Sequence, residues 1–240
     1  MPVLISGFER DLDIIRPLAA RLVSGGGEVR CYLEDDDHEL RSLGCKIAVG
    51  RLDDDSTLEA ALTNVHTFVP LLPDALSLVD LDASGRLEGM IAAIESALSF
   101  AKVASCIAAI SAMGRPPITN QLDDLTLHLS QMDVPTCIVR VGTMIGEERP
   151  VRYASQEGTK IRAVTVPMLI DVIAAADDLE SDDETLELGG ILVEADLGAS
   201  GWEGRAKATS HLDNSALDRF KIASQEHSGH AEHLGAQGLN

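Results

Sequence analysis

Gly7 is the first residue whose type and position suggest a binding site. It follows residues 2–6, a short apolar run typical of a buried strand, and so takes the place of the first glycine in a dinucleotide-binding turn. In such a turn, the later glycines let backbone amides approach a pyrophosphate. Here residues 8–13 read Phe-Glu-Arg-Asp-Leu-Asp, without another glycine. The sequence therefore predicts a fold built to hold a dinucleotide, with its phosphate loop altered.

Charged side chains near this turn bear on which cofactor could bind. Three side chains of the loop are carboxylates, which would oppose an anionic pyrophosphate unless Arg10 compensates. Glu34, followed by three aspartates, ends the predicted strand 28–33. An acidic residue at that point can accept a hydrogen bond from a ribose 2′-hydroxyl. The sequence thus favours NAD over NADP if either binds.

The elements that would position these residues alternate between β-branched runs and helical periods. The predicted strands are residues 2–6, 28–33, 46–49, 66–72, 103–110, 136–141 and 185–188. The predicted helices are residues 12–22, 38–43, 87–101, 122–131 and 166–176, with one more at the capping-box pattern of residues 56–59. This order predicts an α/β fold with a doubly wound, mainly parallel Rossmann-like sheet and helices on both faces.

The C-terminal part of the chain differs in composition. Residues 1–199 would form the Rossmann-like domain, and residues 200–240 a tail rich in Gly, Ala, Ser and His that loses strand character and keeps one possible short helix from Asn214. Three histidines, at positions 227, 230 and 233, would share one side of a helix and could hold a metal. Gly229 and its neighbours favour a flexible polar tail instead, so we predict no metal site.

Overall composition restricts the partners and the compartment. The formal charge of −20 opposes direct binding to nucleic acid or to an anionic membrane surface. A protein partner or a homo-oligomer, bound through the acidic surface or the tail, stays open. The four cysteines are scattered, which predicts reduced thiols, three of them in the core. We find no signal-peptide pattern or long apolar span, so we expect a cytoplasmic protein.

Several further segments match one known family in the same order along the chain. They are residues 27–30, 43–46, 49–54 and 58–65, then Cys137-Ile138-Val139-Arg140-Val141-Gly142 and Leu186-Glu187-Leu188-Gly189-Gly190. The chain resembles the atypical short-chain dehydrogenase/reductase family, in its NmrA-like branch, over most of residues 1–195. The resemblance implies an NAD(P)-binding Rossmann domain.

The resemblance also implies where an active site would lie. The family uses a Ser or Thr after the fifth strand and a Tyr-x-x-x-Lys pair on the next helix. Ser111 keeps the first position, but the tyrosine and lysine positions fall near Ile118 and Leu122, and no Tyr or Lys occurs between Lys102 and Arg140. Neither Ile nor Leu can transfer a proton or lower a neighbour's pKa. Ser111 is therefore the one remaining catalytic candidate.

The family's Gly-Asp-Leu beside the adenine reads Gly-Arg-Leu here, with Arg51 in place of the aspartate. The candidate cofactor-binding residues are then Gly7, Arg10, Glu34, Arg51 and Ser111. These losses predict a non-catalytic or weakly cofactor-binding protein that needs no cofactor and acts as a regulatory, binding or assembly component. The alternative is an NAD(P)H-dependent reductase or an epimerase-like enzyme with a rebuilt phosphate loop.

Overall fold

Seven parallel strands form the central sheet. The computed structural model describes residues 1–72, 82, 84–111, 118–141, 143–145, 160–178, 184–188, 191–197 and 204–210. The strands of this sheet are β1 (Pro2–Ser6), β2 (Glu28–Leu33), β3 (Lys46–Val49), β4 (Thr67–Leu72), β5 (Ser105–Ser111), β6 (Thr136–Val141) and β9 (Glu184–Leu188). Their spatial order is β3-β2-β1-β4-β5-β6-β9, and every neighbouring pair is parallel. The predicted α/β class and doubly wound parallel sheet are confirmed.

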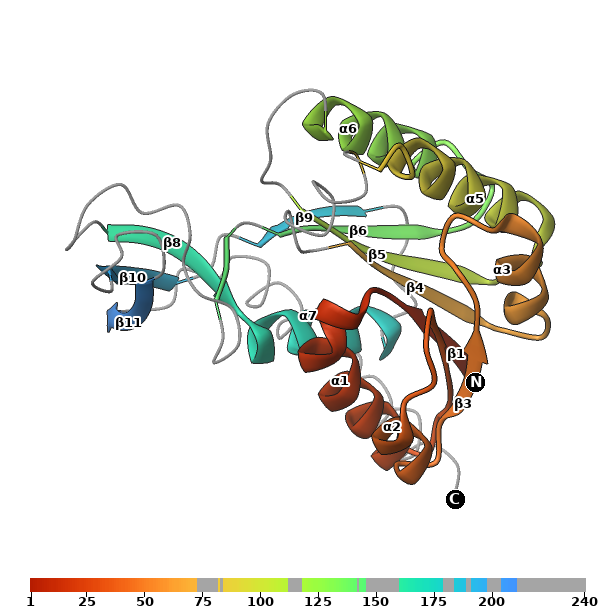
Figure 1. Cartoon of the computed structure of the whole chain (residues 1–240), viewed down its shortest axis with the longest axis horizontal. Coiled ribbons are helices and arrows are strands. Elements are labelled where there is room, and N and C mark those ends of the chain that lie inside the picture. The colour runs from red at the N-terminus through yellow and green to blue at the C-terminus, as the bar shows by residue number, and fades with distance from the viewer. Residues whose placement is uncertain are drawn as a thin grey trace, which may run out of the picture.

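Helices cover both faces of this sheet, as Figure 1 shows. They are the short 3-10 helix η1 (Glu9–Asp11), then α1 (Leu12–Ser24), α2 (His38–Ser42), α3 (Asp55–Leu62), α5 (Leu87–Phe100), α6 (Ile118–Leu129) and α7 (Val166–Asp178). Strand residues alternate between two cores because successive side chains point to opposite faces. Val3 and Ile5 join the core beneath α1, α2 and α7, whereas Leu4 joins the core beneath α3, α5 and α6.

The order of the strands alone predicts where a ligand should bind. The chain leaves β1 toward β2 and β3 on one side, and returns to β4, β5 and β6 on the other. In open α/β sheets, ligands bind at the carboxyl ends of the strands where this order reverses. The loops after β1 and β2 therefore border the expected site.

A second, smaller sheet corrects our reading of the C-terminal part. It contains β7 (Thr143–Ile145), β8 (Lys160–Thr165), β10 (Ile191–Leu197) and β11 (Gly204–Ser210), in the order β11-β10-β8-β7. Strand β11 lies within the stretch that we expected to lack strands, and it pairs antiparallel with β10. Its small and polar residues give no apolar run, so its pairing with β10 could not be read from local sequence. The histidine triplet and the helix from Asn214 lie outside the described residues.

The start of α3 is a second correction. We expected Ser56 to cap this helix, but the cap is Asp54, whose carboxylate accepts a hydrogen bond from the Thr57 backbone amide at 3.3 Å. Ser56 instead donates its hydroxyl to Asp54 at 2.7 Å. A carboxylate two residues upstream therefore takes the role, since its charge also favours the helix N-terminus.

All four cysteines are free, as we predicted, and Cys45 is buried together with the three that we expected in the core. Burial raises the pKa of Cys31, Cys45 and Cys106 above the ordinary thiol value. None of the helices in the described ranges is long and apolar enough to cross a bilayer.

Candidate functional site

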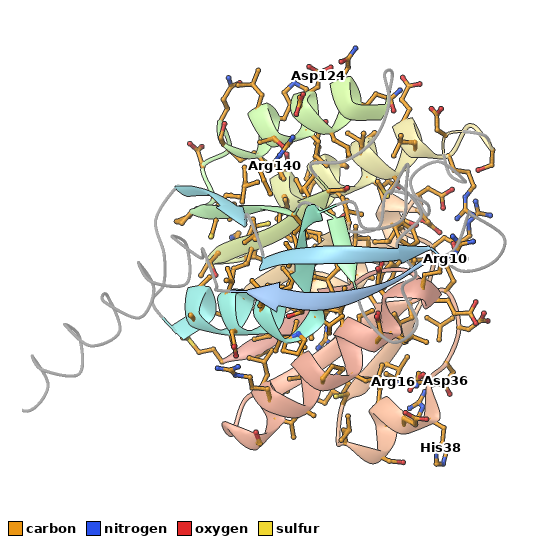
Figure 2. The ribbon with its side chains drawn as sticks, turned by 90° about the vertical axis from the view of Figure 1, so that its left-hand side faces the viewer. Arg10, Arg16, Asp36, His38, Asp124 and Arg140 are labelled. Atoms are coloured by element: carbon orange, nitrogen blue, oxygen red, sulfur yellow. The ribbon has the colours of Figure 1, made fainter. Side chains whose placement is uncertain are left out.

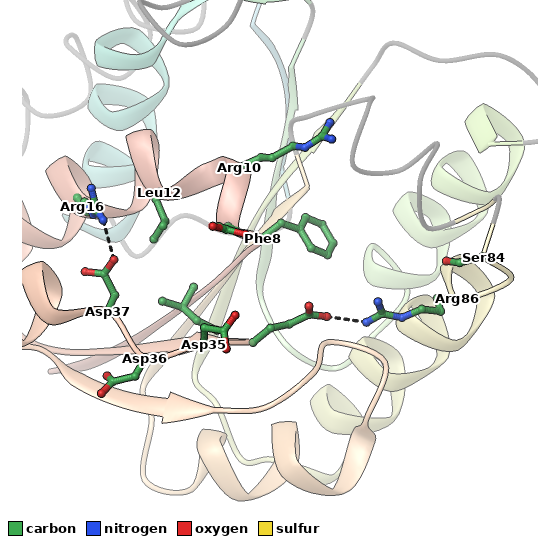
Figure 3. Close-up of a pocket in the computed structure, with 12 residues that line it drawn as sticks. Phe8, Arg10, Leu12, Arg16, Asp35, Asp36, Asp37, Ser84 and Arg86 are labelled. Atoms are coloured by element: carbon green, nitrogen blue, oxygen red, sulfur yellow. Dashed lines mark hydrogen bonds and ion pairs between the residues drawn. The ribbon is translucent and has the colours of Figure 1, made fainter.

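A cleft of about 420 Å³ opens at the carboxyl ends of β1 and β2. Its walls come from the β1–α1 loop, the side of α1, the acidic segment after β2 and the residues that precede α5; Figure 3 shows them as sticks. The volume lies within the range of small-molecule sites. The cleft therefore stands where the strand order predicts a ligand.

Gly7 lies at the base of this loop in tight packing. A Cβ atom on Gly7 would stand 3.1 Å from the Ile15 Cδ1 atom and 3.4 Å from the Leu71 Cβ atom. The glycine thus lets β1 approach α1 and β4 closely, which is a packing role. It does not itself line the cleft.

The carboxylates that follow Gly7 do not all face the cleft. Asp11 is fully buried, and its Oδ2 atom accepts a hydrogen bond from the Phe8 backbone amide at 3.2 Å. The Asp11 amide in turn donates to the Phe8 carbonyl at 2.9 Å. This reciprocal pair closes the turn in place of the missing glycines, and leaves Glu9 and Arg10 on the cleft wall.

The acidic segment after β2 is held against α1. The Asp37 carboxylate caps α2 by accepting the Leu40 amide at 2.8 Å, and it also accepts the Arg16 guanidinium at 2.8 Å. Burial opposes ionisation of Asp37, but these two bonds outweigh it and lower its pKa. The segment is therefore fixed along one edge of the molecule, where Figure 2 shows Arg16 and Asp36, far from Asp124 on α6.

Arg86 joins the opposite wall of the cleft to β2. It is the N-cap residue of α5, and its Nη2 atom lies 2.6 Å from Glu34 Oε1, the pair drawn in Figure 3. Its Nε atom lies 2.8 Å from Asp53 Oδ2. Bonds to Asp53 and to Glu34 raise the pKa of Arg86. One guanidinium thus ties together α5, the end of β2 and the loop after β3.

The loop after β3 forms the adjoining, charged corner. Arg51 makes two hydrogen bonds to Asp53, at 2.9 and 2.6 Å, and Asp53 is only 11% exposed. The bonds from Arg51 and Arg86 keep the pKa of Asp53 far below its ordinary value. Arg51, at the position where the family places an aspartate, therefore pairs with an aspartate two residues later in the sequence.

The side chain of Tyr32 holds the loop after β3 in place. It is fully buried in β2, and its hydroxyl donates to the Arg51 carbonyl at 2.8 Å and lies 2.6 Å from the Thr57 hydroxyl. Burial raises the pKa of Tyr32, so the phenol stays neutral. A Cβ atom on Gly50 would stand 2.4 Å from this hydroxyl, so that glycine is needed for the tyrosine to fit.

The catalytic candidate Ser111 lies at the end of β5, and the positions of the missing tyrosine and lysine lie on α6. Ser111 is buried there, in register with Val141 of β6. Leu122, at the position expected for a lysine, is fully buried in the core beneath α5 and α6. The side chain of Ile118 lies outside the described residues. Neither Ser111 nor Leu122 lines the cleft.

The structure thus brings together part of the predicted site. Arg10 and Glu34 line one cleft, and Gly7 packs beneath it. Arg51 is linked through Asp53 to Arg86 of the cleft wall, while Ser111 is separate. The sequence did not point to Arg86 or to the buried role of Asp11. Arg86 falls beside an irregular stretch, and its partners lie 33 and 52 positions away in the chain.

The fold of this chain is similar to that of several proteins with solved structures. No family model matches the chain, and no curated protein matches it. A short-chain dehydrogenase/reductase superfamily protein from Agrobacterium tumefaciens with bound NAD has a TM-score of 0.61 at 14% identity, covering 97% of this chain and 100% of that one.

Two further solved structures are similar to it. A double mutant of DesIV, a dTDP-glucose 4,6-dehydratase from Streptomyces venezuelae with NAD and DAU bound, has a TM-score of 0.62 at 11% identity, over 80% of this chain and 77% of that one. MoeE5 in complex with UDP-glucose and NAD has a TM-score of 0.62 at 16% identity, over 81% and 78%.

The chain has the fold of the short-chain dehydrogenases/reductases. The fold implied by the sequence resemblance is therefore confirmed. Our expectation that no cofactor is needed is wrong on this comparison, because three of the proteins that share the fold hold NAD. The expectation rested on the lost glycines, the missing tyrosine–lysine pair and the arginine at the adenine-side position, and the first of these losses is compensated. Asp11 closes the turn in place of the glycines, and the cleft beside it persists.

Proposed function

We propose that this protein binds NAD in the cleft at the carboxyl ends of β1 and β2. The observation that carries the proposal is the placement of Glu34, which directly follows β2 and lines a cleft of about 420 Å³. A carboxylate at that point can accept the ribose 2′-hydroxyl of a dinucleotide. The NAD held by three proteins of the same fold supports the same reading.

The charge of the cleft favours NAD over NADP. Five carboxylates line it, from Glu9, Glu34 and the three residues after Glu34, against three arginines. A 2′-phosphate beside Glu34 would meet like charge at short range, which costs binding free energy. In the loop after β1, Arg10 supplies a positive charge for the pyrophosphate of the dinucleotide. The carboxylates of Glu9 and Asp11, on either side of Arg10, would otherwise repel that pyrophosphate.

We further propose that the bound dinucleotide serves a binding, regulatory or assembly role, without the tyrosine–lysine chemistry of the fold. Leu122 fills the lysine position with an apolar side chain in the core. The chain has two tyrosines, of which Tyr32 is committed to the Arg51 carbonyl, and the other lies outside the described residues. Four reduced thiols are consistent with a cytoplasmic location.

Isothermal titration calorimetry with the full chain tests the proposal. NAD should give saturable, one-to-one binding, and NADP should bind more weakly. Saturation at 100 times the dissociation constant should also raise the free energy of unfolding by about 2.7 kcal/mol. Replacing Glu34 with glutamine should weaken NAD binding about tenfold, since a charge-assisted hydrogen bond becomes a neutral one. No saturable heat with millimolar NAD would overturn the proposal.

The second candidate is an NAD(P)-dependent reductase or epimerase-like enzyme, which Ser111 supports. A serine at the end of β5 could polarise a substrate carbonyl, and the nicotinamide would carry the hydride. Incubation with NAD and either UDP-glucose or dTDP-glucose, followed by NADH absorbance and product analysis, separates the two. Turnover that Ser111→Ala abolishes, with NAD affinity unchanged, would favour the enzyme.

A further inference from the structure

Arg86, on the cleft wall, divides one guanidinium between two carboxylates, those of Asp53 and Glu34. Asp53, its closest carboxylate by Nε, already accepts two hydrogen bonds from Arg51. Arg86 is therefore one of two cations that pair with Asp53. Its other partner is Glu34, with 2.6 Å between Arg86 Nη2 and Glu34 Oε1.

The two members of this pair stand at the same place on the cleft wall. Both line the cleft, and both keep substantial exposure, 31% for the Arg86 side chain and 47% for that of Glu34. The bond uses one carboxylate oxygen of Glu34, and a carboxylate can accept at both. A group that bonds the other oxygen therefore lies within a few ångströms of a guanidinium.

Which group can bind there depends on the charge of Glu34. A ribose 2′-hydroxyl donates to a carboxylate, whereas a 2′-phosphate can only accept from donors or pair with cations. While Glu34 is ionised it repels the phosphate and neutralises Arg86. Without that charge, Arg86 would keep its bonds to Asp53 from Nε and Nη2, and its remaining Nη donors, on a permanently charged group, could bind a phosphate.

We propose that the Glu34–Arg86 ion pair is the determinant of cofactor choice, with Arg86 as a 2′-phosphate receptor that Glu34 masks. The inference rests on the proposed function, since it concerns the ribose end of the same dinucleotide site. Arg86 reaches this point from the start of α5, a different element from β2, where the family places its phosphate-binding arginine.

Calorimetric titration of NAD and NADP against four variants tests the pair. Glu34→Gln should bind NADP at least tenfold more tightly than wild type does and NAD about tenfold more weakly, because one charged hydrogen bond is gained and one lost. In Glu34→Gln with Arg86→Met, the gain for NADP should disappear. Arg86→Lys on the Glu34→Gln background should keep part of the gain, since lysine supplies the charge without the fork.

Glu28→Gln is the matched control for charge alone. Glu28 begins β2, the strand that Glu34 follows, but it does not line the cleft and pairs with Lys46. This variant removes the same charge and should leave both dissociation constants within about twofold of wild type. Thermal unfolding of each variant confirms that it is folded.

The outcomes separate the two proposals. The ion-pair inference fails if Glu34→Gln gains no affinity for NADP, if the gain survives Arg86→Met, or if Glu28→Gln shows an equal gain. If the wild-type chain binds neither NAD nor NADP and Glu34→Gln binds neither, the proposed function fails and takes this inference with it.

Discussion

Replacing Gly50 with alanine should destabilise the protein strongly. The new Cβ atom would stand 2.4 Å from the Tyr32 hydroxyl oxygen and 2.7 Å from two carbons of its ring. Ordinary contacts begin near 3.4 Å, so the ring or the backbone must shift by about 1 Å. The ring cannot move freely, because it is buried in β2 and its hydroxyl is bonded to the Arg51 carbonyl and the Thr57 hydroxyl.

The size of the effect follows from two costs. Overpacking a buried site costs about 1–3 kcal/mol. Loss of the hydrogen bonds of a buried phenol adds about 1–3 kcal/mol. We therefore expect the free energy of unfolding to fall by about 2–6 kcal/mol, which lowers the melting temperature by roughly 4–24 °C in a protein of this size.

Urea denaturation and differential scanning calorimetry measure this change directly. Gly89→Ala is the matched control, since its Cβ would meet only Asp53 Cβ at 3.7 Å, an ordinary contact, inside helix α5. That variant should be neutral or up to about 1 kcal/mol more stable, because alanine favours helix. The packing argument is refuted if Gly50→Ala lies within about 0.5 kcal/mol of wild type.

Three further predictions follow from the described contacts. Asp53→Asn should lower the free energy of unfolding by about 2 kcal/mol at pH 7, and the difference should shrink in denaturation series below about pH 4, because the depressed pKa of Asp53 stabilises the fold only while the group is ionised in both states. A stability difference that grows on acidification would contradict this prediction. Asp54→Ala should lower the melting temperature more than Ser56→Ala, since Asp54 caps α3; a larger loss in Ser56→Ala would show that the serine is the cap. All four thiols should react with a disulfide reagent only after denaturation, because all are buried; rapid labelling of the native protein would show an exposed one.

Much of the sheet could be predicted from local sequence. Strands β1, β2, β3 and β6 have the predicted bounds, since each is a short apolar or β-branched run of the kind that parallel sheets favour. Strand β11 could not be predicted, because its residues carry no apolar run and its partner β10 supplies the hydrogen bonds. Pairing between strands is a property of the folded chain.

The candidate site divides in the same way. Gly7 and Glu34 could be placed because each directly follows or ends a strand, and the ends of neighbouring parallel strands meet at one edge. Arg86 reaches Glu34 across 52 positions of the chain, and nothing in the local sequence reports such a pair. The burial of Asp11 was hidden for a similar reason, since a carboxylate in a loop is more often solvated than turned inward to a backbone amide.

A crystal structure of the full chain grown with NAD tests the central claim most directly. We predict electron density for the dinucleotide in the cleft, with the adenosine ribose 2′-hydroxyl within about 3 Å of the Glu34 carboxylate and the pyrophosphate beside the loop of residues 8–11. Arg86 should keep its bond to Glu34 in that complex. An empty cleft at saturating NAD, or a dinucleotide bound elsewhere on the molecule, would contradict the account.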